Sequence, residues 1–116
     1  MQSNSQAAVA DAPARSAQDD RPKPRQQPPY AVVVYNDDEH TFQYVIETLK
    51  KVFGYPTEKG FQLAEEIHTR GRAVVWSGSK EVAELKRDQV RGAGKDFYAV
   101  KPVTFPLGCD IEPMPG

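Results

Sequence analysis

The hydrophobic positions of the chain fall into short groups whose spacing predicts the secondary structure. Residues 31–35 form a β-branched run that is typical of a strand. Residues 72–76 predict a second strand, and the aromatic and β-branched run at residues 97–103 predicts a third. We therefore expect strands near the start, the middle and the end of the patterned region.

Three other segments have the apolar spacing of amphipathic helices. The first covers residues 42–53, and Gly54 fits its end. The second is entered at Pro56, with Thr57 as its expected N-cap, and ends before Gly71. The third follows Ser79 and ends at Gly92. The expected inward residues are Phe42, Val45, Ile46, Leu49, Val52 and Phe53 in the first helix, Phe61, Ala64, Ile67 and His68 in the second, and Val82, Leu85 and Val90 in the third.

The order of these elements, β-α-α-β-α-β, predicts a single α+β domain over residues 29–105. Residues 1–28 carry almost no large apolar side chain, so burial cannot offset their ordering entropy and we expect a disordered N-terminal extension. Residues 106–116 have no pattern and are expected to be an irregular tail.

Composition removes several classes of function. A net charge of −1 argues against a phosphate-binding surface for nucleic acid. The single cysteine, Cys109, cannot form an internal disulfide. No apolar run approaches the ~20 residues of a membrane span, and no signal peptide is evident. We therefore expect a cytoplasmic protein without a membrane or nucleic-acid partner.

A polar triplet lies where the first strand gives way to the first helix. One of Asn36, Asp37 and Asp38 would be enough to cap the helix and hold the turn, so the other two suggest a further role. His68 lies at the end of the second helix, with Ile67 beside it. If the triplet faces His68, the result is an acidic rim around an apolar hole, which suits an ammonium group attached to an apolar side chain.

A catalytic function has less support in the sequence. Asp37, Asp38, His40 and His68 include no pair with the i, i+4 spacing of a compact metal motif. Cys109 lies in the tail without pattern, and Ser77 and Ser79 are explained as turn and cap residues, so no nucleophile stands out. We expect no enzyme, no metal and no cofactor. A small metal-dependent enzyme remains the alternative.

The motifs resemble those of a known family. Val-Tyr-Asn-Asp-Asp, His-Thr-Phe, Tyr-Val-Ile, Val-Phe-Gly-Tyr, Ile-His-Thr-Arg-Gly-Arg-Ala and Glu-Val-Ala-Glu-Leu-Lys follow one another with the spacing found in the ClpS adaptors. ClpS delivers N-degron substrates to the Clp protease. The resemblance covers roughly residues 29–90 and implies three helices with a three-stranded antiparallel sheet.

The resemblance also implies roles for individual residues. Asn36, Asp37, Asp38 and His68 would hold the free α-amino group of a substrate that starts with Phe, Tyr, Trp or Leu. Glu81 and Lys86 would help to dock the adaptor on the N-terminal domain of a Clp AAA+ unfoldase of the ClpA or ClpC type. The pocket for the first side chain would be lined by Thr41, Phe42, Val45, Ala64 and Ile67.

Three departures from the family pattern bear on these roles. Phe42 and Ala64 each stand where the family commonly has Met, and residues 96–103 align poorly. A bulkier Phe42 bears directly on which side chains can enter. A second alternative is therefore a degenerate paralogue, which docks on the unfoldase but binds no N-degron because Phe42 blocks the pocket.

Overall fold

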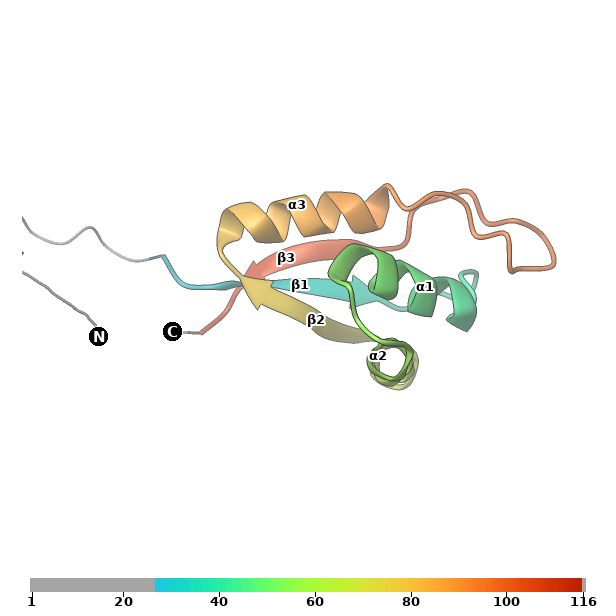
Figure 1. The fold of residues 1–116 in the computed structure, drawn as a ribbon, viewed down its shortest axis with the longest axis horizontal. Helices are drawn as coiled ribbons and strands as arrows, with labels where there is room; N and C mark the ends of the chain where they lie inside the picture. Colours follow the sequence, from blue (N-terminus) through green and yellow to red (C-terminus); the bar gives the residue numbers. More distant parts are fainter. Residues whose placement is uncertain (1–26, 116) are drawn as a thin grey trace, which may run out of the picture.

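The computed structural model describes residues 27–115, which form three strands and three helices (Figure 1). The strands build one antiparallel sheet in the order β2-β1-β3. The predicted α+β class and the three-stranded antiparallel sheet are thus confirmed. The elements in chain order are β1 (Tyr30–Tyr35), α1 (Phe42–Phe53), α2 (Thr57–Arg70), β2 (Arg72–Gly78), α3 (Lys80–Arg91) and β3 (Cys109–Pro113).

Strand β1 is the centre of the core. It pairs with β2 on one edge and β3 on the other, and residues 31–34 are at most 2% exposed. Residues on both faces of this strand are buried, so its sequence is a continuous apolar run and does not alternate with polar residues. Val32 and Val34 share the core with Leu49 of α1, Ile67 of α2 and Val90 of α3, so all three helices are fixed against the sheet.

The helix ends follow the local sequence closely. Gly54 (φ 72°) and Gly71 (φ 88°) end α1 and α2 in the left-handed conformation that glycine adopts without strain. The side chain of Ser79 accepts a hydrogen bond from the backbone N–H of Val82, as a cap should. The expectation that Thr57 caps α2 is wrong, because the cap position belongs to Pro56 and α2 begins at Thr57 itself.

The predicted third strand is also wrong. Residues 97–103 form no strand, and only the isolated bridge between Asp96 and Val103 pairs there. The third strand is β3, Cys109–Pro113, inside the segment that was expected to be an irregular tail. After α3 the chain makes a projecting loop and returns to the sheet at Gly108 (Figure 1). The carbonyl of Gly108 accepts a hydrogen bond from the backbone N–H of Tyr35.

Of the three residues of α3 predicted to face inward, only Val90 does so. Ala83 and Val90 are fully buried, whereas Val82 is 39% and Leu85 is 54% exposed. The prediction assumed that the larger apolar side chains of the helix face the core. Instead, a small residue faces the sheet, which allows the helix to approach closely, and the larger apolar residues lie outside.

Two further expectations concern the N-terminal extension and the absence of a membrane-spanning segment. The proposed disordered extension, residues 1–28, falls almost entirely outside the described residues. Among residues 27–115, no helix is both long and apolar enough to cross a membrane.

Candidate functional site

A pocket of about 290 Å³ opens where the joint between β1 and α1 meets the end of α2. Its polar residues come from the joint and from the last turn of α2, and its apolar residues come from the facing sides of α1 and α2. The lining consists of Asn36, Asp37, Asp38, His40, Phe42, Val45, Ala64, Ile67 and His68. The structure therefore brings the predicted triplet, His68 and four of the five predicted pocket residues together.

A backbone hydrogen bond brings the two polar groups face to face. The N–H of Asn36 donates to the carbonyl of Gly71 at 2.9 Å, which ties the start of the site loop (residues 36–41) to the end of α2. His68 lies one helical turn before Gly71, so its exposed side chain reaches the same rim as the triplet.

Asp37 holds the site loop in shape. Its Oδ1 accepts from the backbone N–H groups of Glu39 at 2.8 Å and His40 at 2.7 Å, and its Oδ2 lies 2.7 Å from Nδ1 of His40. Burial by itself would raise the pKa of Asp37, but the hydrogen bonds from His40 and Glu39 outweigh it, so the pKa lies below its ordinary value. Both oxygens of Asp37 are thus engaged within the loop.

Asp38 has a different environment. It is exposed, and its carboxylate accepts no hydrogen bond from residues 27–115. Asn36 is exposed as well. The carboxylate of Asp38, the amide of Asn36 and the imidazole of His68 are therefore the polar groups at the rim that are available to a ligand, and a carboxylate and an amide oxygen are acceptors for an ammonium group.

The floor of the pocket is apolar and one side of its mouth is aromatic. Val45, Ala64 and Ile67 are buried. Phe42, which was predicted to be part of the buried stripe of α1, is 37% exposed. Its ring meets the rings of Phe61 at 5.4 Å and His68 at 6.3 Å between centroids, both edge-on. Phe42 therefore forms a side wall, and the pocket remains open beside it.

Thr41 does not line the pocket, contrary to the prediction. Its hydroxyl caps α1 by accepting from the backbone N–H of Tyr44 at 3.1 Å. Its own N–H donates to Oδ2 of Asp96 at 2.6 Å. The polar atoms of Thr41 are thus used to start the helix and to attach the chain that follows α3.

His40 was considered above only as a metal ligand. The structure shows its side chain 1% exposed, with Nδ1 beside Asp37 and Nε2 at 3.0 Å from the carbonyl oxygen of Phe105. Both ring nitrogens are therefore occupied by protein acceptors. Within the described residues, no three His, Cys, Asp or Glu side chains are grouped in a way that could hold a metal ion.

Cys109 does not lie in an irregular tail. It is the first residue of β3, 4% exposed, and burial raises the pKa of its thiol to about 12. A thiol of this kind is protonated at neutral pH and is a poor nucleophile.

The two predicted docking residues lie on α3, away from the pocket. Glu81 is exposed in the first turn. Lys86 is half-buried, with its Nζ donating to the carbonyl of Val52 at 2.9 Å and lying over the ring of Phe53. Lys86 therefore also ties α3 to the end of α1.

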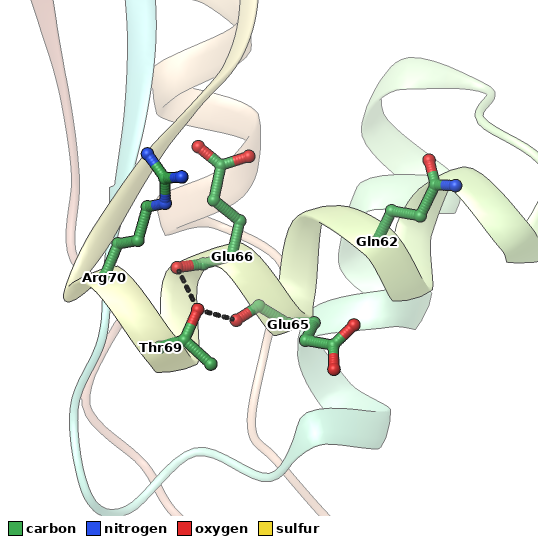
Figure 2. A pocket seen from close by; sticks show the side chains of 5 residues that line it. All are labelled: Gln62, Glu65, Glu66, Thr69 and Arg70. Atoms are coloured by element: carbon green, nitrogen blue, oxygen red, sulfur yellow. Dashed lines mark hydrogen bonds between the residues drawn. The ribbon is translucent and has the colours of Figure 1, made fainter.

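A larger hollow, of about 480 Å³, runs along the outer face of α2 (Figure 2). All of its lining residues come from this one helix, and Thr69 bonds back to the carbonyls of Glu65 and Glu66 in the preceding turn. It has no second wall and no apolar floor, so it is a solvated helix face rather than a candidate site. Its lining residues are Gln62, Glu65, Glu66, Thr69 and Arg70.

Comparison with known proteins gives a consistent result. The profile of the family described as "ATP-dependent Clp protease adaptor protein ClpS" matches residues 25–109. The ClpS adapter protein of Nostoc sp. is 44% identical over 68 residues, which is 58% of this chain and 70% of that protein. The corresponding protein of Pectobacterium carotovorum is 42% identical over 95 residues, covering 80% of this chain and 84% of that one.

A solved structure is also similar. Agrobacterium tumefaciens ClpS2 bound to L-phenylalaninamide superposes with a TM-score of 0.62 at 29% identity, covering 77% of this chain and 100% of that one. From the profile match and the identities together, the chain belongs to the ClpS family of ATP-dependent Clp protease adaptor proteins.

Proposed function

We propose that this adaptor binds the free α-amino group and the bulky apolar first residue of N-degron substrates and delivers them to a Clp unfoldase. The observation that carries the proposal is the pocket itself, which has an apolar floor of Val45, Ala64 and Ile67 below a rim with acceptors at Asn36 and Asp38. In this proposal, Asn36, Asp38 and His68 hold the ammonium group, and Asp37 keeps the loop in shape.

The energetics of such a site suit a shuttle. An α-amino group has a pKa of about 7.7–8.0 and is mostly charged at neutral pH. Each charge-assisted hydrogen bond contributes about 1.5–3 kcal/mol, and burying one Phe or Leu side chain contributes a similar amount, about 1.5–3 kcal/mol. After the costs of association, a dissociation constant on the order of micromolar is expected. Release to a downstream partner is then possible.

The proposal is tested with peptides that differ only at the first residue, each with a free or an acetylated N-terminus. We expect binding to peptides that start with Phe, Tyr, Trp or Leu and no binding to their acetylated forms, because acetylation removes both the charge and donor hydrogens. Equal binding of free and acetylated peptides would overturn the proposal.

Two matched variants assign the rim. Asp38→Ala should weaken binding of every such peptide by tenfold or more, on the order expected for a hydrogen bond to a charged group. Glu39→Ala removes a neighbouring exposed carboxylate that does not line the pocket and should change affinity little. An equal loss in both variants would mean that the effect is general electrostatics and not a contact.

The same measurements test the alternative hypothesis that the chain is a degenerate paralogue. A chain that docks on the unfoldase but binds none of the free peptides would be such a paralogue. The partly exposed, side-wall position of Phe42 supports an open pocket and therefore the adaptor that binds substrate.

A further inference from the structure

His40 lies between the pocket and the α3–β3 loop (residues 92–108). It is one of the residues that line the pocket. The ring of Phe105 meets it edge-on, with centroids 4.9 Å apart and an interplanar angle of 78°, and the carbonyl of Phe105 lies 3.0 Å from its Nε2. One face of the imidazole is stacked on Tyr44 at 5.1 Å. Phe105 therefore packs against a residue of the pocket wall.

The α3–β3 loop is fixed to the site at several points. Asp96 is 0% exposed and accepts from the backbone N–H of Thr41 at 2.6 Å and from its hydroxyl at 3.3 Å. The hydroxyl of Tyr44 donates to the carbonyl of Gly94 at 2.6 Å. Backbone hydrogen bonds also join Asp96 to Val103 in both directions. These contacts fix the position of the loop, and hence of Phe105, relative to the pocket.

Phe105 is nevertheless 47% exposed, so half of a well-placed aromatic ring faces solvent beside a binding pocket. Aromatic side chains held rigidly at the surface are typical contact points for a partner. An extended peptide advances ~3.3–3.6 Å per residue. A peptide whose first side chain fills the pocket and whose chain leaves past His40 would bring its second or third residue to the Phe105 ring.

We propose that Phe105 is a second contact point for the substrate, which packs against an apolar side chain at the second or third position of the peptide. This inference rests on the proposed function, because it requires the N-terminal residue to occupy the pocket. His40 positions the contact through its hydrogen bond to the Phe105 carbonyl, which no side-chain substitution at residue 105 removes.

The test compares ligands that reach Phe105 with one that does not. L-phenylalaninamide fills the pocket alone, Phe-Leu-Leu-Gly-Gly extends past it with apolar side chains, and Phe-Gly-Gly-Gly-Gly extends past it without them. The unaltered chain should bind the Leu peptide more tightly than the Gly peptide. Phe105→Ser should remove that difference, a loss of about three- to tenfold. Its affinity for L-phenylalaninamide should stay within about twofold of the unaltered value.

Leu85→Ser is the matched control, since Leu85 is exposed to a similar degree but lies on α3 outside the pocket. It should preserve the preference for the Leu peptide. A melting curve of Phe105→Ser shows whether the variant is folded, and Phe105→Leu, which keeps an apolar contact, should retain part of the preference.

Each remaining outcome counts against the inference. If Phe105→Ser weakens the binding of L-phenylalaninamide as much as that of the Leu peptide, residue 105 shapes the pocket and makes no second contact. If Phe105→Ser still prefers the Leu peptide, the peptide leaves the pocket by another side. If the unaltered chain binds none of the ligands, the proposed function fails and this inference fails with it.

Discussion

The carboxylates of Asp37 and Asp38 are neighbours in the sequence, yet their surroundings differ. Asp37 is turned back onto the site loop and accepts from Glu39 and His40, whereas Asp38 is exposed at the rim. The resemblance to the family assigned both to the ligand. In the structure, by contrast, the carboxylate of Asp37 maintains the loop, and the exposed carboxylate of Asp38 is the one that we propose contacts the ammonium group.

The lowered pKa of Asp37 predicts a dependence of stability on pH. Because its pKa in the folded chain is below the ordinary value of 3.8, the unfolded chain takes up the proton first as the pH falls. The stabilisation from Asp37 is therefore complete above about pH 4 and is lost as the pH falls below it. Urea unfolding of the unaltered chain and of Asp37→Asn should show the largest difference near neutral pH, about 1 kcal/mol, and a smaller one at pH 3.

Asp38→Asn is the control for that measurement, because the side chain of Asp38 is exposed. Its free energy of unfolding should follow that of the unaltered chain at both pH values. A pH-independent difference between the unaltered chain and Asp37→Asn would contradict the prediction.

The position of Phe42 at the pocket mouth leads us to a prediction about which first side chains can enter. Phe42 narrows one side of the mouth, where a residue branched at Cβ is stiff and bulky, so peptides that start with Val or Ile should bind poorly. Phe42→Ala should widen the mouth and bring the affinity for Val closer to that for Leu. Phe61→Ala is the control, since Phe61 contacts Phe42 but does not line the pocket. An unchanged ratio of Leu to Val affinity in Phe42→Ala would show that another residue sets the preference.

The polar rim, Val45 and Ile67 were predictable from their places at a strand end, a helix stripe and a helix end. Phe42 and Ala64 were assigned to the pocket only through the resemblance to the family. The supporting contacts were not predictable. Phe105 is 65 residues from His40, and Asp96 is 55 residues from Thr41. No periodicity in the sequence relates positions so far apart, and a buried Asp in a loop looks like an ordinary turn residue until its partner is known.

At the scale of the elements, the strands and helices predicted from the sequence occur in the structure everywhere except after α3. Residues 97–103 are rich in aromatic and β-branched side chains and so resemble a strand, whereas β3 contains Asp, Glu and Pro and does not. The strand that pairs with β1 is nevertheless β3. Asp96 ties the chain to the start of α1, which keeps the following residues away from the sheet, and the free edge of β1 is left for Cys109–Pro113.

The two residues that we expect to dock on the unfoldase differ in their effect on stability, because only Lys86 joins α3 to α1. Lys86 donates to Val52 in the last turn of α1, where carbonyls lack helical partners, so Lys86→Ala should lower the free energy of unfolding by about 1 kcal/mol. Glu81 is exposed and Glu81→Ala should leave stability unchanged. Both variants should weaken binding to the N-terminal domain of a Clp unfoldase while peptide affinity is kept.

Binding to the immobilised unfoldase domain, peptide anisotropy and urea unfolding measure the three quantities separately. A folded Glu81→Ala variant that has lost peptide binding would show that α3 belongs to the pocket. One that docks as well as the unaltered chain would show that the docking surface lies elsewhere.

For the molecule as a whole, the pocket and the proposed docking residues lie on different elements of one small domain. The pocket uses the site loop, α1 and α2, whereas Glu81 and Lys86 belong to α3. This arrangement suits the proposed delivery, in which the adaptor would hold a peptide and an unfoldase at the same time.

The N-terminal extension should matter for delivery only. Residues 1–28 carry almost no large apolar side chain, and within residues 27–115 the core cluster and the residues packed against it begin at Tyr30. Deleting residues 1–26 should thus leave the melting temperature and peptide affinity unchanged, and slow the degradation of a model substrate by the unfoldase and its protease. Equal rates of degradation would show that the extension is only a tether.

The burial of Cys109 gives the chain an internal reporter of edge-strand opening. It is the only thiol present, it is enclosed where β3 pairs with β1, and its raised pKa leaves almost no thiolate in the closed state. Alkylation must therefore wait until β3 detaches, and its rate measures how often that edge opens. Labelling should be far slower in buffer than in urea. A rate equal to that of a free thiol would mean that β3 is detached nearly all the time.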